Sequence, residues 1–241
     1  MISIIIPTLN EKSVIESTLR AIRDGLTDIP FELIVTDSAS TDGTQAIAAR
    51  YATVIEHDLR KEKKTIAWNK DQGAAAAHGE FYVFIDADVQ IPNPNAFFKT
   101  ALARFAADPK IVALTTNLWV FPETATLMDK IVFGMVNLDH WFNNNVTRFG
   151  SASGEFQMIR ADAFNKLHGY REHLAVAEDN DMFSRLASIG RTRFETSLKV
   201  YHTGRRAHEL GWGKVLWDWF INYFSVKLLN RSHDKEWRVI R

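Results

Sequence analysis

The sequence predicts an α/β domain built on a mostly parallel β-sheet. Short apolar runs recur at residues 2–6, 31–36, 81–85 and 111–114, and helical periodicity fills the intervals between them. The chain has 241 residues, of which 46% are hydrophobic and 24% charged, which is ordinary for a globular protein. A chain of this length can bury a substantial core, and one large domain is the simplest arrangement.

Two helices are expected to cover the first strands. The apolar residues of the first are spaced by four, three and four positions and share one face: Ile15, Leu19, Ile22 and Leu26. Asn10, just upstream, is a candidate cap for this helix. The second helix is expected within residues 95–107, where the apolar positions are Phe98, Ala101, Leu102 and Phe105.

The texture changes beyond residue 115. A probable amphipathic helix carries five apolar residues on one face: Leu127, Ile131, Met135, Leu138 and Phe142. A polar, glycine-rich stretch follows at 143–154. We expect this half of the chain to shape the site of a second substrate.

Charge and cysteine content exclude several classes of protein. Lys plus Arg and Asp plus Glu each count 29, so the formal net charge is 0 and no global field attracts nucleic acid. Without cysteine, disulfides, thiolate metal sites and a cysteine nucleophile are excluded. Residues 1–7 lack the basic segment and apolar length of a signal peptide. These features predict a cytoplasmic location, including the inner face of the membrane.

Two carboxylates directly follow the third apolar run. Asp86-Ala87-Asp88 stands at the carboxyl end of an expected parallel strand, where open α/β sheets place their ligands. Alternation along an extended chain would point Asp86 and Asp88 to the same side, so that both could reach one hard cation. The alternative interpretation is a solvated acidic turn.

A second polar turn, from Asp37 to Thr44, follows the strand at 31–36 and leads into a helix. Asp37 could accept hydrogen bonds from the N–H groups of a nucleotide base. The opposite wall would come from the end of the first strand, with Thr8, Asn10 and Glu11. The alternative is a structural turn that caps the following helix.

Several segments, in one order along the chain, resemble the family 2 glycosyltransferases. They are residues 3–11, the turn 37–44, Lys64 with Asn69 and Gly73, the strand region 79–88, and the acidic run 178–181. The resemblance implies a GT-A fold, a UDP- or GDP-sugar donor, Mg²⁺ or Mn²⁺, and inverting transfer to a saccharide or lipid-linked acceptor. The alternative is an inactive nucleotide-sugar-binding or scaffolding module of the same fold.

The resemblance also implies roles by position. Asp179 resembles the catalytic base, Asp37 the base-binding aspartate, and Asp86 with Asp88 the metal-associated Asp-x-Asp motif, in which Asp88 would be the direct ligand. His202 resembles a histidine that completes the metal shell. The other donor-side positions are Pro7, Thr8, Asn10, Glu11, Lys64, Asn69 and Ala87. The acceptor side is expected to include Glu178, Arg205 and Arg206, although a solvated arginine pair is an equal alternative.

The sequence departs from the family pattern in three ways, of which the first is Trp68, before Asn69, where many members carry arginine or leucine. Ser38-Ala39 follows Asp37 where a second aspartate is common, which leaves base selectivity open. The Gln-x-x-Arg-Trp signature of processive polysaccharide synthases is missing, as are their transmembrane helices. The sequence therefore favours transfer of a single sugar over polymerisation.

We expect residues 1–206 to form the glycosyltransferase domain, with a donor half at 1–115 and an acceptor half at 116–206. Residues 207–241 would form an aromatic-rich amphipathic segment. Between Val215 and Leu229 only four residues are polar: Asp218, Asn222, Ser225 and Lys227. A helix over this stretch is about 22 Å long, too short for roughly 30 Å of bilayer hydrocarbon. It suits peripheral membrane association through 212–231, with burial against the domain or in a homodimer contact as the alternatives.

Overall fold

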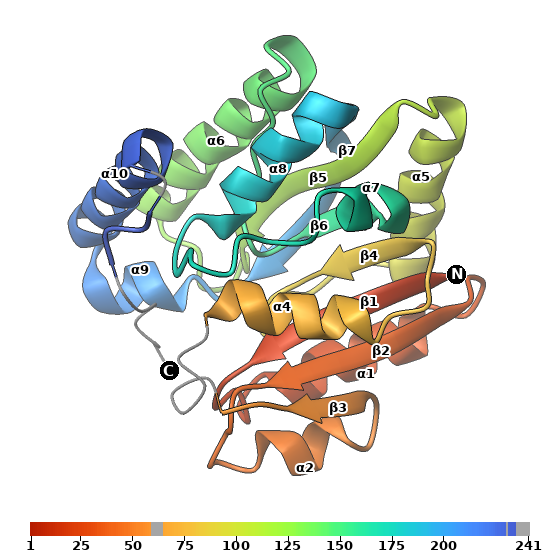
Figure 1. The fold of residues 1–241 in the computed structure, drawn as a ribbon. Coiled ribbons are helices and arrows are strands. Elements are labelled where there is room, and N and C mark those ends of the chain that lie inside the picture. The colour runs from red at the N-terminus through yellow and green to blue at the C-terminus, as the bar shows by residue number, and fades with distance from the viewer. Residues whose placement is uncertain (59–64, 230, 235–241) are drawn as a thin grey trace.

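The computed structural model describes residues 1–58, 65–229 and 231–234, and its centre is a seven-stranded sheet flanked by helices (Figure 1). The strands lie in the order β3-β2-β1-β4-β6-β5-β7. Their bounds are β1 (Ile2–Thr8), β2 (Phe31–Asp37), β3 (Thr53–Glu56), β4 (Phe81–Phe84), β5 (Ile111–Val120), β6 (Gln157–Arg160) and β7 (Arg191–His202). The expected mostly parallel sheet is confirmed, because only β6 pairs antiparallel with its neighbours.

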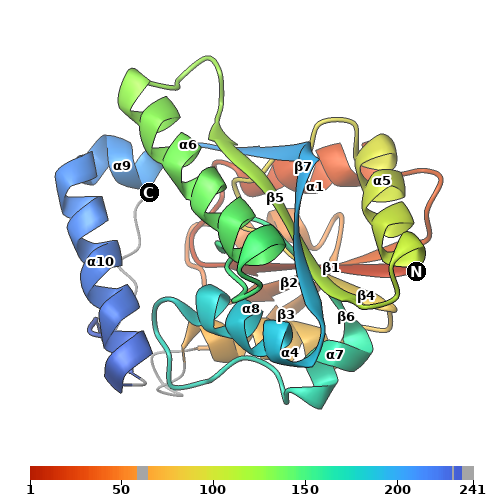
Figure 2. The same cartoon turned by 90° about the horizontal axis from the view of Figure 1, so that it is seen from above.

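Helices cover both faces of the sheet. α1 (Ile15–Gly25), α2 (Thr44–Ala48) and α5 (Pro94–Ala107) pack on one face. α4 (Ile66–Ala75), α7 (Ala161–Lys166) and α8 (Glu178–Ile189) pack on the other (Figure 1). The remaining helices are α6 (Leu127–Trp141), the π-helical turn η1 (Phe142–Val146), α9 (Arg205–Leu210) and α10 (Trp212–Leu229). α9 and α10 lie at one side of the molecule, and α6 runs from that side toward its middle (Figure 2).

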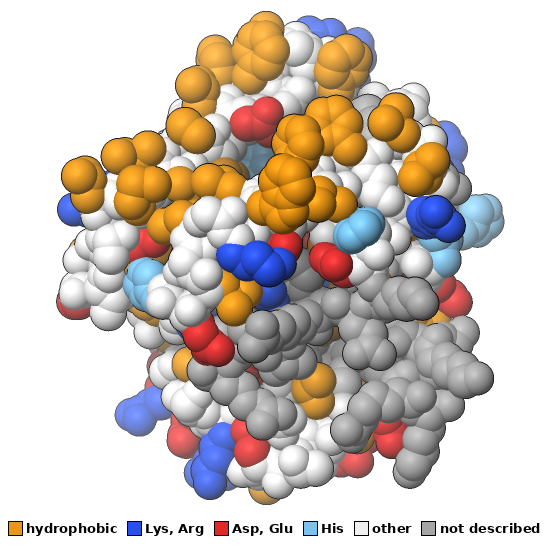
Figure 3. All heavy atoms as spheres, turned by 90° about the vertical axis from the view of Figure 1, so that its left-hand side faces the viewer, with side chains coloured by type: hydrophobic (Ala, Val, Ile, Leu, Met, Phe, Trp, Pro, Cys, Tyr) orange, Lys and Arg blue, Asp and Glu red, His pale blue; other side chains and the backbone are white. Residues whose placement is uncertain are grey.

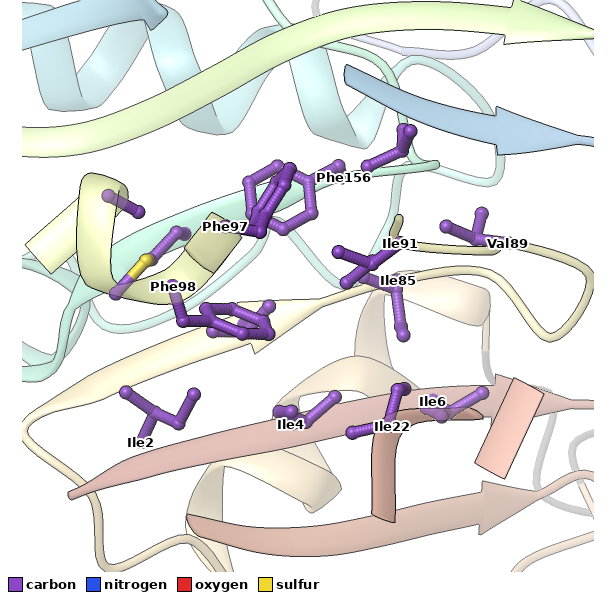
Figure 4. Packing of buried hydrophobic residues seen from close by; sticks show 14 of the residues in the cluster. Ile2, Ile4, Ile6, Ile22, Ile85, Val89, Ile91, Phe97, Phe98 and Phe156 are labelled. Carbon is purple, nitrogen blue, oxygen red and sulfur yellow. The ribbon is translucent and has the colours of Figure 1, made fainter. Parts of the chain in front are cut away.

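The core follows the alternation of side chains along β1. Ile2, Ile4 and Ile6 point into the cluster that also holds Phe98 and Phe156 (Figure 4). Ile5 points into the cluster on the opposite face. The predicted helix faces are confirmed, because all four apolar residues expected on α1, Leu26 included, belong to the buried core, as do Phe98, Ala101 and Phe105.

The prediction that Asn10 caps the first helix is wrong. α1 begins at Ile15, after Val14, and no side chain caps it. Asn10 instead has a positive φ of 57°, and its side-chain oxygen accepts a hydrogen bond of 2.9 Å from the backbone N–H of Thr41. The left-handed backbone turns the chain sharply after β1, which is a conformation that asparagine tolerates.

The apolar face predicted on α6 exists, but it points outward. Leu127, Ile131, Met135 and Leu138 are exposed, and so is Phe142 in η1. The inward face combines Val132 and Phe133 with buried polar side chains, among them Asp129, Asn137 and His140. Asn137 pairs with the backbone of β5 through Leu118, and Asp129 accepts hydrogen bonds from Trp212 and pairs with His208.

The apolar side of α10 points outward as well. Its polar stripe faces the protein, where Asn222 is 1% exposed and bonds the backbone of Asp218 and the residues 233–234. Its outward side carries seven exposed large side chains: Leu216, Trp217, Phe220, Tyr223, Phe224, Leu228 and Leu229. Figure 3, which views the molecule from the side where α10 lies, shows hydrophobic side chains gathered over the upper part of the view. No helix in the described parts of the chain is long and apolar enough to cross a bilayer.

Candidate active site

The carboxyl ends of several strands meet at one edge of the sheet. β1 ends at Thr8, β2 at Asp37 and β7 at His202, and the Asp-x-Asp segment follows β4. β6 alone runs in the opposite direction, so the sequence-predicted residues on these strands share an edge. Lys64, which the sequence analysis placed near the donor, lies outside the described residues.

The turn after β2 is organised around the buried carboxylate of Asp37. Its Oδ1 accepts hydrogen bonds from the backbone N–H of Ser40 (2.8 Å) and from Gln45 Nε2 (2.7 Å). Its Oδ2 accepts from the hydroxyls of Thr8 (2.8 Å) and Ser40 (2.6 Å). With 0% exposure and four donors from its own chain, Asp37 could contact a nucleotide base only if one of these donors moved.

The turn after β1 is tied to this same segment. The backbone N–H of Asn10 donates to Ser40 Oγ at 2.7 Å, and the N–H of Glu11 donates to Thr44 Oγ1 at 2.9 Å. From α4, the Asn69 amide donates to the carbonyl of Thr36 at 2.9 Å. The side-chain oxygen of Asn69 is buried and has no partner among the described residues, so it keeps a free acceptor behind the turns.

Pro7 and Ala87 are buried and act through their backbones. Pro7 pairs with Thr36 across β1 and β2, and the carbonyl of Ala87 accepts a hydrogen bond of 2.7 Å from Thr18 on α1. These two positions fix the strand ends at the edge of the sheet.

The Asp-x-Asp segment turns instead of continuing its strand, because β4 ends at Phe84. Asp88 Oδ2 accepts a hydrogen bond from the hydroxyl of Thr203, and the charges of both Asp86 and Asp88 act on Arg205. Burial raises the pKa of Asp86 well above its usual range, the charge of Glu155 raises it further, and Lys70 opposes the rise. The turn at 87–88 replaces the extended backbone on which the expected orientation of the two carboxylates was based.

Arg205, at the start of α9, bridges the turn after β1 and the Asp-x-Asp segment after β4. Its guanidinium donates to both carboxylate oxygens of Glu11 at 2.7 Å, in a forked ion pair. Its Nε lies 3.5 Å from Asp88 Oδ2. Burial raises the pKa of Glu11, and Arg205 opposes that rise. Arg205 was expected on the acceptor side, and the structure places it between two residues expected on the donor side; Arg206 follows it on α9.

His202, the last residue of β7, is buried beside α6. It is 8% exposed, and its ring packs edge-on against Phe133 at a centroid distance of 4.9 Å. Its Nδ1 accepts a hydrogen bond of 3.4 Å from the N–H of Gly204, whereas its buried Nε2 has no partner among the described residues. The hydroxyl of the next residue, Thr203, donates to Asp88 Oδ2, so Asp88 is tied to the segment that follows His202.

The carboxylates of this set suit Mg²⁺ or Mn²⁺, because both ions prefer oxygen ligands. Within the described ranges, no three acidic or histidine side chains are grouped to hold a metal ion by themselves. Hard cations are commonly bound by one or two side chains together with substrate phosphates. The residues present therefore fit a cation that a diphosphate helps to hold.

Glu178 and Asp179 begin α8 and surround a lysine that the sequence analysis missed. Lys70 Nζ, from α4, lies 2.8 Å from Glu178 Oε1 and 2.8 Å from Asp179 Oδ1. Burial, followed by the charge of Asp179, raises the pKa of Glu178 to about 7. Burial alone would lower the pKa of Lys70, but the two carboxylates outweigh it and raise this pKa well above its usual range.

Gln157 and Tyr170 complete this cluster. Gln157 Nε2 donates to Asp179 Oδ1 at 2.8 Å, and Tyr170 donates its hydroxyl proton to Gln157 Oε1 at 2.6 Å. Gln157 opens β6, a strand that the apolar pattern did not predict. The only signal for Lys70 was its position next to Asn69, and a lone lysine in a helix ordinarily indicates a solvated side chain.

A family model and several known proteins match large parts of the chain. The family model "Glycosyl transferase family 2" matches residues 3–168. The succinoglycan biosynthesis protein ExoA of Rhizobium meliloti is 29% identical over 194 residues, covering 78% of this chain and 58% of that protein. The glucosyl-3-phosphoglycerate synthase of Mycobacterium tuberculosis is 38% identical over 104 residues, covering 39% of this chain and 30% of that protein.

Solved structures show the same fold. The mannosyltransferase PcManGT of Pyrobaculum calidifontis, in complex with GDP-Man and Mn²⁺, superposes with a TM-score of 0.74 at 22% identity, over 95% of this chain and 64% of that one. The Mycobacterium tuberculosis synthase with Mn²⁺ and UDP-glucose gives a TM-score of 0.61 at 22% identity, over 93% and 78%. The chain thus spans about three fifths of the first of these relatives and of the first of these structures.

Proposed function

Since the chain belongs to glycosyl transferase family 2 and has the GT-A fold that its sequence predicted, we propose that it transfers one sugar from a UDP- or GDP-sugar to an acceptor hydroxyl, with inversion. Residues 1–115 would bind the donor and 116–206 the acceptor. The observation that carries the proposal is the state of Asp179. One of its oxygens accepts two hydrogen bonds, and the other receives none from any described residue.

Asp179 would act as the general base. A Cβ placed on Gly154 would lie 2.9 Å from Asp179 Oδ2 and 3.7 Å from Asp86 Oδ1, so both oxygens border the bare backbone of this glycine. A carboxylate with a free oxygen at the ligand-binding edge can take the proton of an acceptor hydroxyl as the sugar is transferred. Glu178 supports this geometry from the first turn of α8.

The leaving diphosphate would be held at the opposite part of the edge. Asp88 and His202 would hold a divalent cation there, and Asp86 would add negative charge behind it. When bound, the cation offsets the charge that develops on the diphosphate. Arg205 lies within ion-pair distance of Asp88 and brings positive charge to the same place. Mn²⁺ in the complexes of the mannosyltransferase and the synthase supports this part of the proposal.

A thermal-shift panel of UDP-glucose, UDP-GlcNAc and GDP-mannose, each with and without Mn²⁺, tests the donor proposal. A ligand at 100 times its dissociation constant adds about 2.7 kcal/mol, which corresponds to roughly 5 to 10 °C for a chain of this size. We expect one nucleotide class to stabilise the chain, and more so with Mn²⁺. Stabilisation without any release of nucleoside diphosphate would favour the inactive binding module, and no shift at all would contradict donor binding.

The outward-facing apolar sides of α6 and α10 also support the expected peripheral membrane association through 212–231, with a lipid-linked acceptor as the substrate. α10 presents Trp217, Tyr223 and other aromatic side chains outward, and amphipathic side chains of this kind favour the interface of a bilayer. α6 adds its own exposed apolar side chains on the same side of the molecule (Figures 2 and 3).

Liposome flotation of the full chain tests this association. The wild-type chain should float, and Trp217→Glu/Phe220→Glu should remain in the dense fraction, because both side chains are more than half exposed, at 60% and 55%. Ser17→Glu/Ala106→Glu adds the same two charges at exposed positions of α1 and α5 and should float like the wild type. A wild-type chain that forms dimers and does not float would identify the apolar face as a homodimer contact.

A further inference from the structure

Lys70 is a cation almost completely enclosed by the acidic side of the site. It is 2% exposed, and its ammonium group lies between Glu178 and Asp179 and 5.3 Å from the centre of the Tyr170 ring. We infer that Lys70 is a positioning residue, which fixes the Asp179 carboxylate by one oxygen, supplies the positive charge beside its acidic neighbours, and leaves the second oxygen for the acceptor. This inference rests on the proposed function, because it concerns the base of that reaction.

The hydrogen bonds on Asp179 are all on one side. Lys70 and Gln157 both donate to Oδ1, each at 2.8 Å, and Tyr170 holds Gln157 in place through its hydroxyl. An oxygen with two strong donors is a poor proton acceptor, whereas an oxygen without donors retains its basicity. The two donors therefore set which oxygen of Asp179 can react and lock the rotation of its carboxylate.

The charges around Asp179 explain why one of these donors must be a cation. From α8, Glu178 faces it, and from the turn after β4, Asp86 contributes a further carboxylate. Lys70, on α4, is the positive charge that acts on both of these acids as well as on Asp179. Gln157 of β6 is neutral, and Tyr170 is held protonated by its burial. Without Lys70, protonation of Asp179 would relieve the repulsion between the acids.

A purely structural ion pair would behave differently. It would lower the stability of the fold and the fraction of active protein, but it would leave the pH dependence of the remaining activity unchanged. A positioning role moves the acid limb of that dependence, because the cation sets how readily Asp179 binds a proton. The direction follows from the charge: removal of Lys70 favours the protonated, inactive carboxyl and shifts the acid limb to higher pH.

The test compares Lys70→Met with Gln157→Met in the full chain. Each variant removes one hydrogen bond to the same oxygen, but only the first removes a charge. The readout is release of nucleoside diphosphate, with Mn²⁺, from whichever of UDP-glucose, UDP-GlcNAc or GDP-mannose stabilises the chain most. Both variants should turn over more slowly than the wild type. Only Lys70→Met should move the acid limb, upward by about one to three pH units.

Two further variants keep the result interpretable. Lys70→Arg retains the charge and should restore the wild-type position of the acid limb, even if its larger group lowers turnover. If Lys70→Met does not fold, as judged by its nucleotide-dependent thermal shift, Lys70→Gln keeps a donor without a charge and should give the same upward shift. An acid limb at the wild-type position in a folded Lys70→Met or Lys70→Gln protein overturns the inference.

Failure of the inference can be told apart from failure of the proposed function. Asp179→Asn, assayed in parallel, should lose activity whether or not Lys70 positions the carboxylate. Full activity in Asp179→Asn would refute the assignment of the base. Loss of activity in Asp179→Asn, together with an unmoved acid limb in the folded Lys70 variants, would refute the positioning role alone.

Discussion

The turn after β2 and the start of α8 each present an aspartate at the same edge of the sheet, Asp37 buried and Asp179 half-buried, but they use it differently. Asp37 accepts four hydrogen bonds from its own chain, two on each oxygen. Asp179 accepts two, both on one oxygen, and the other oxygen borders Gly154. The comparison teaches that motif position does not separate a structural carboxylate from a reactive one, whereas unused hydrogen-bonding capacity does.

The comparison predicts its largest effect for Asp179→Asn. The substitution keeps the size of the side chain but removes the proton acceptor, so turnover should fall by roughly 10² to 10⁴-fold. Nucleotide affinity, measured by calorimetry with Mn²⁺, should stay near the wild-type value because Asp179 contacts no residue of the β1 and β2 turns in this structure. Unchanged turnover would show that Asp179 is not the reactive carboxylate of the two.

A smaller effect, on stability, is expected for Asp37→Asn. The amide oxygen can still accept from Ser40 and Gln45, but the NH₂ group must face the hydroxyls that donated to Oδ2. We expect the free energy of unfolding to fall by about 1 to 3 kcal/mol in urea titrations. Nucleotide affinity of the folded protein should change less than tenfold. A large loss of affinity at unchanged stability would instead support the base-binding role that the family resemblance implies.

The fold was predictable where periodicity alone decides the outcome. The apolar runs at 2–6, 31–36, 81–85 and 111–114 became β1, β2, β4 and β5 because buried parallel strands are apolar on both faces. β6 is polar at both of its ends, at Gln157 and Arg160, and β7 is a polar-rich edge strand, so neither has that signature. In α6 and α10 the periodicity identified an apolar face, but it contains no information on whether that face points inward.

The site was predictable only in part, for a related reason. Asp86, Asp88, Asp179 and His202 stand in segments that resemble a family, so their positions could be named from the sequence. Lys70 pairs with residues 108 and 109 positions away, and Arg205 pairs with Glu11 across 194 positions. Such ion pairs depend on how the elements pack, and a single sequence does not record that packing.

A third carboxyl group, Asp71, accepts fewer hydrogen bonds than Asp37 or Asp179. It lies half-buried on α4 beside the cluster and accepts one hydrogen bond, of 3.0 Å, from the backbone N–H of Tyr170. Burial raises its pKa to about 7, while the ordinary pKa of an aspartate is 3.8. The folded state therefore binds a proton that the unfolded state releases between about pH 4 and 7. Stability from this group is fully present near pH 4 and is lost as the pH rises toward 7.

Asp71→Asn should remove that loss, because an amide accepts the same hydrogen bond without a charge. Urea unfolding at pH 8 should show a gain of about 1 to 3 kcal/mol over the wild type, below the full value of the shift because solvent screens part of it. At pH 4 both proteins carry a neutral side chain here, and the gain should vanish. An equal gain at both pH values would show that packing, not ionisation, distinguishes the two side chains. A gain confined to high pH would show that ionisation of Asp71 is what lowers the stability. Asp37, with four hydrogen-bond donors, and Asp71, with one, would then be the two ends of a series in which the number of donors sets the energetic cost of ionising a carboxyl group inside the fold.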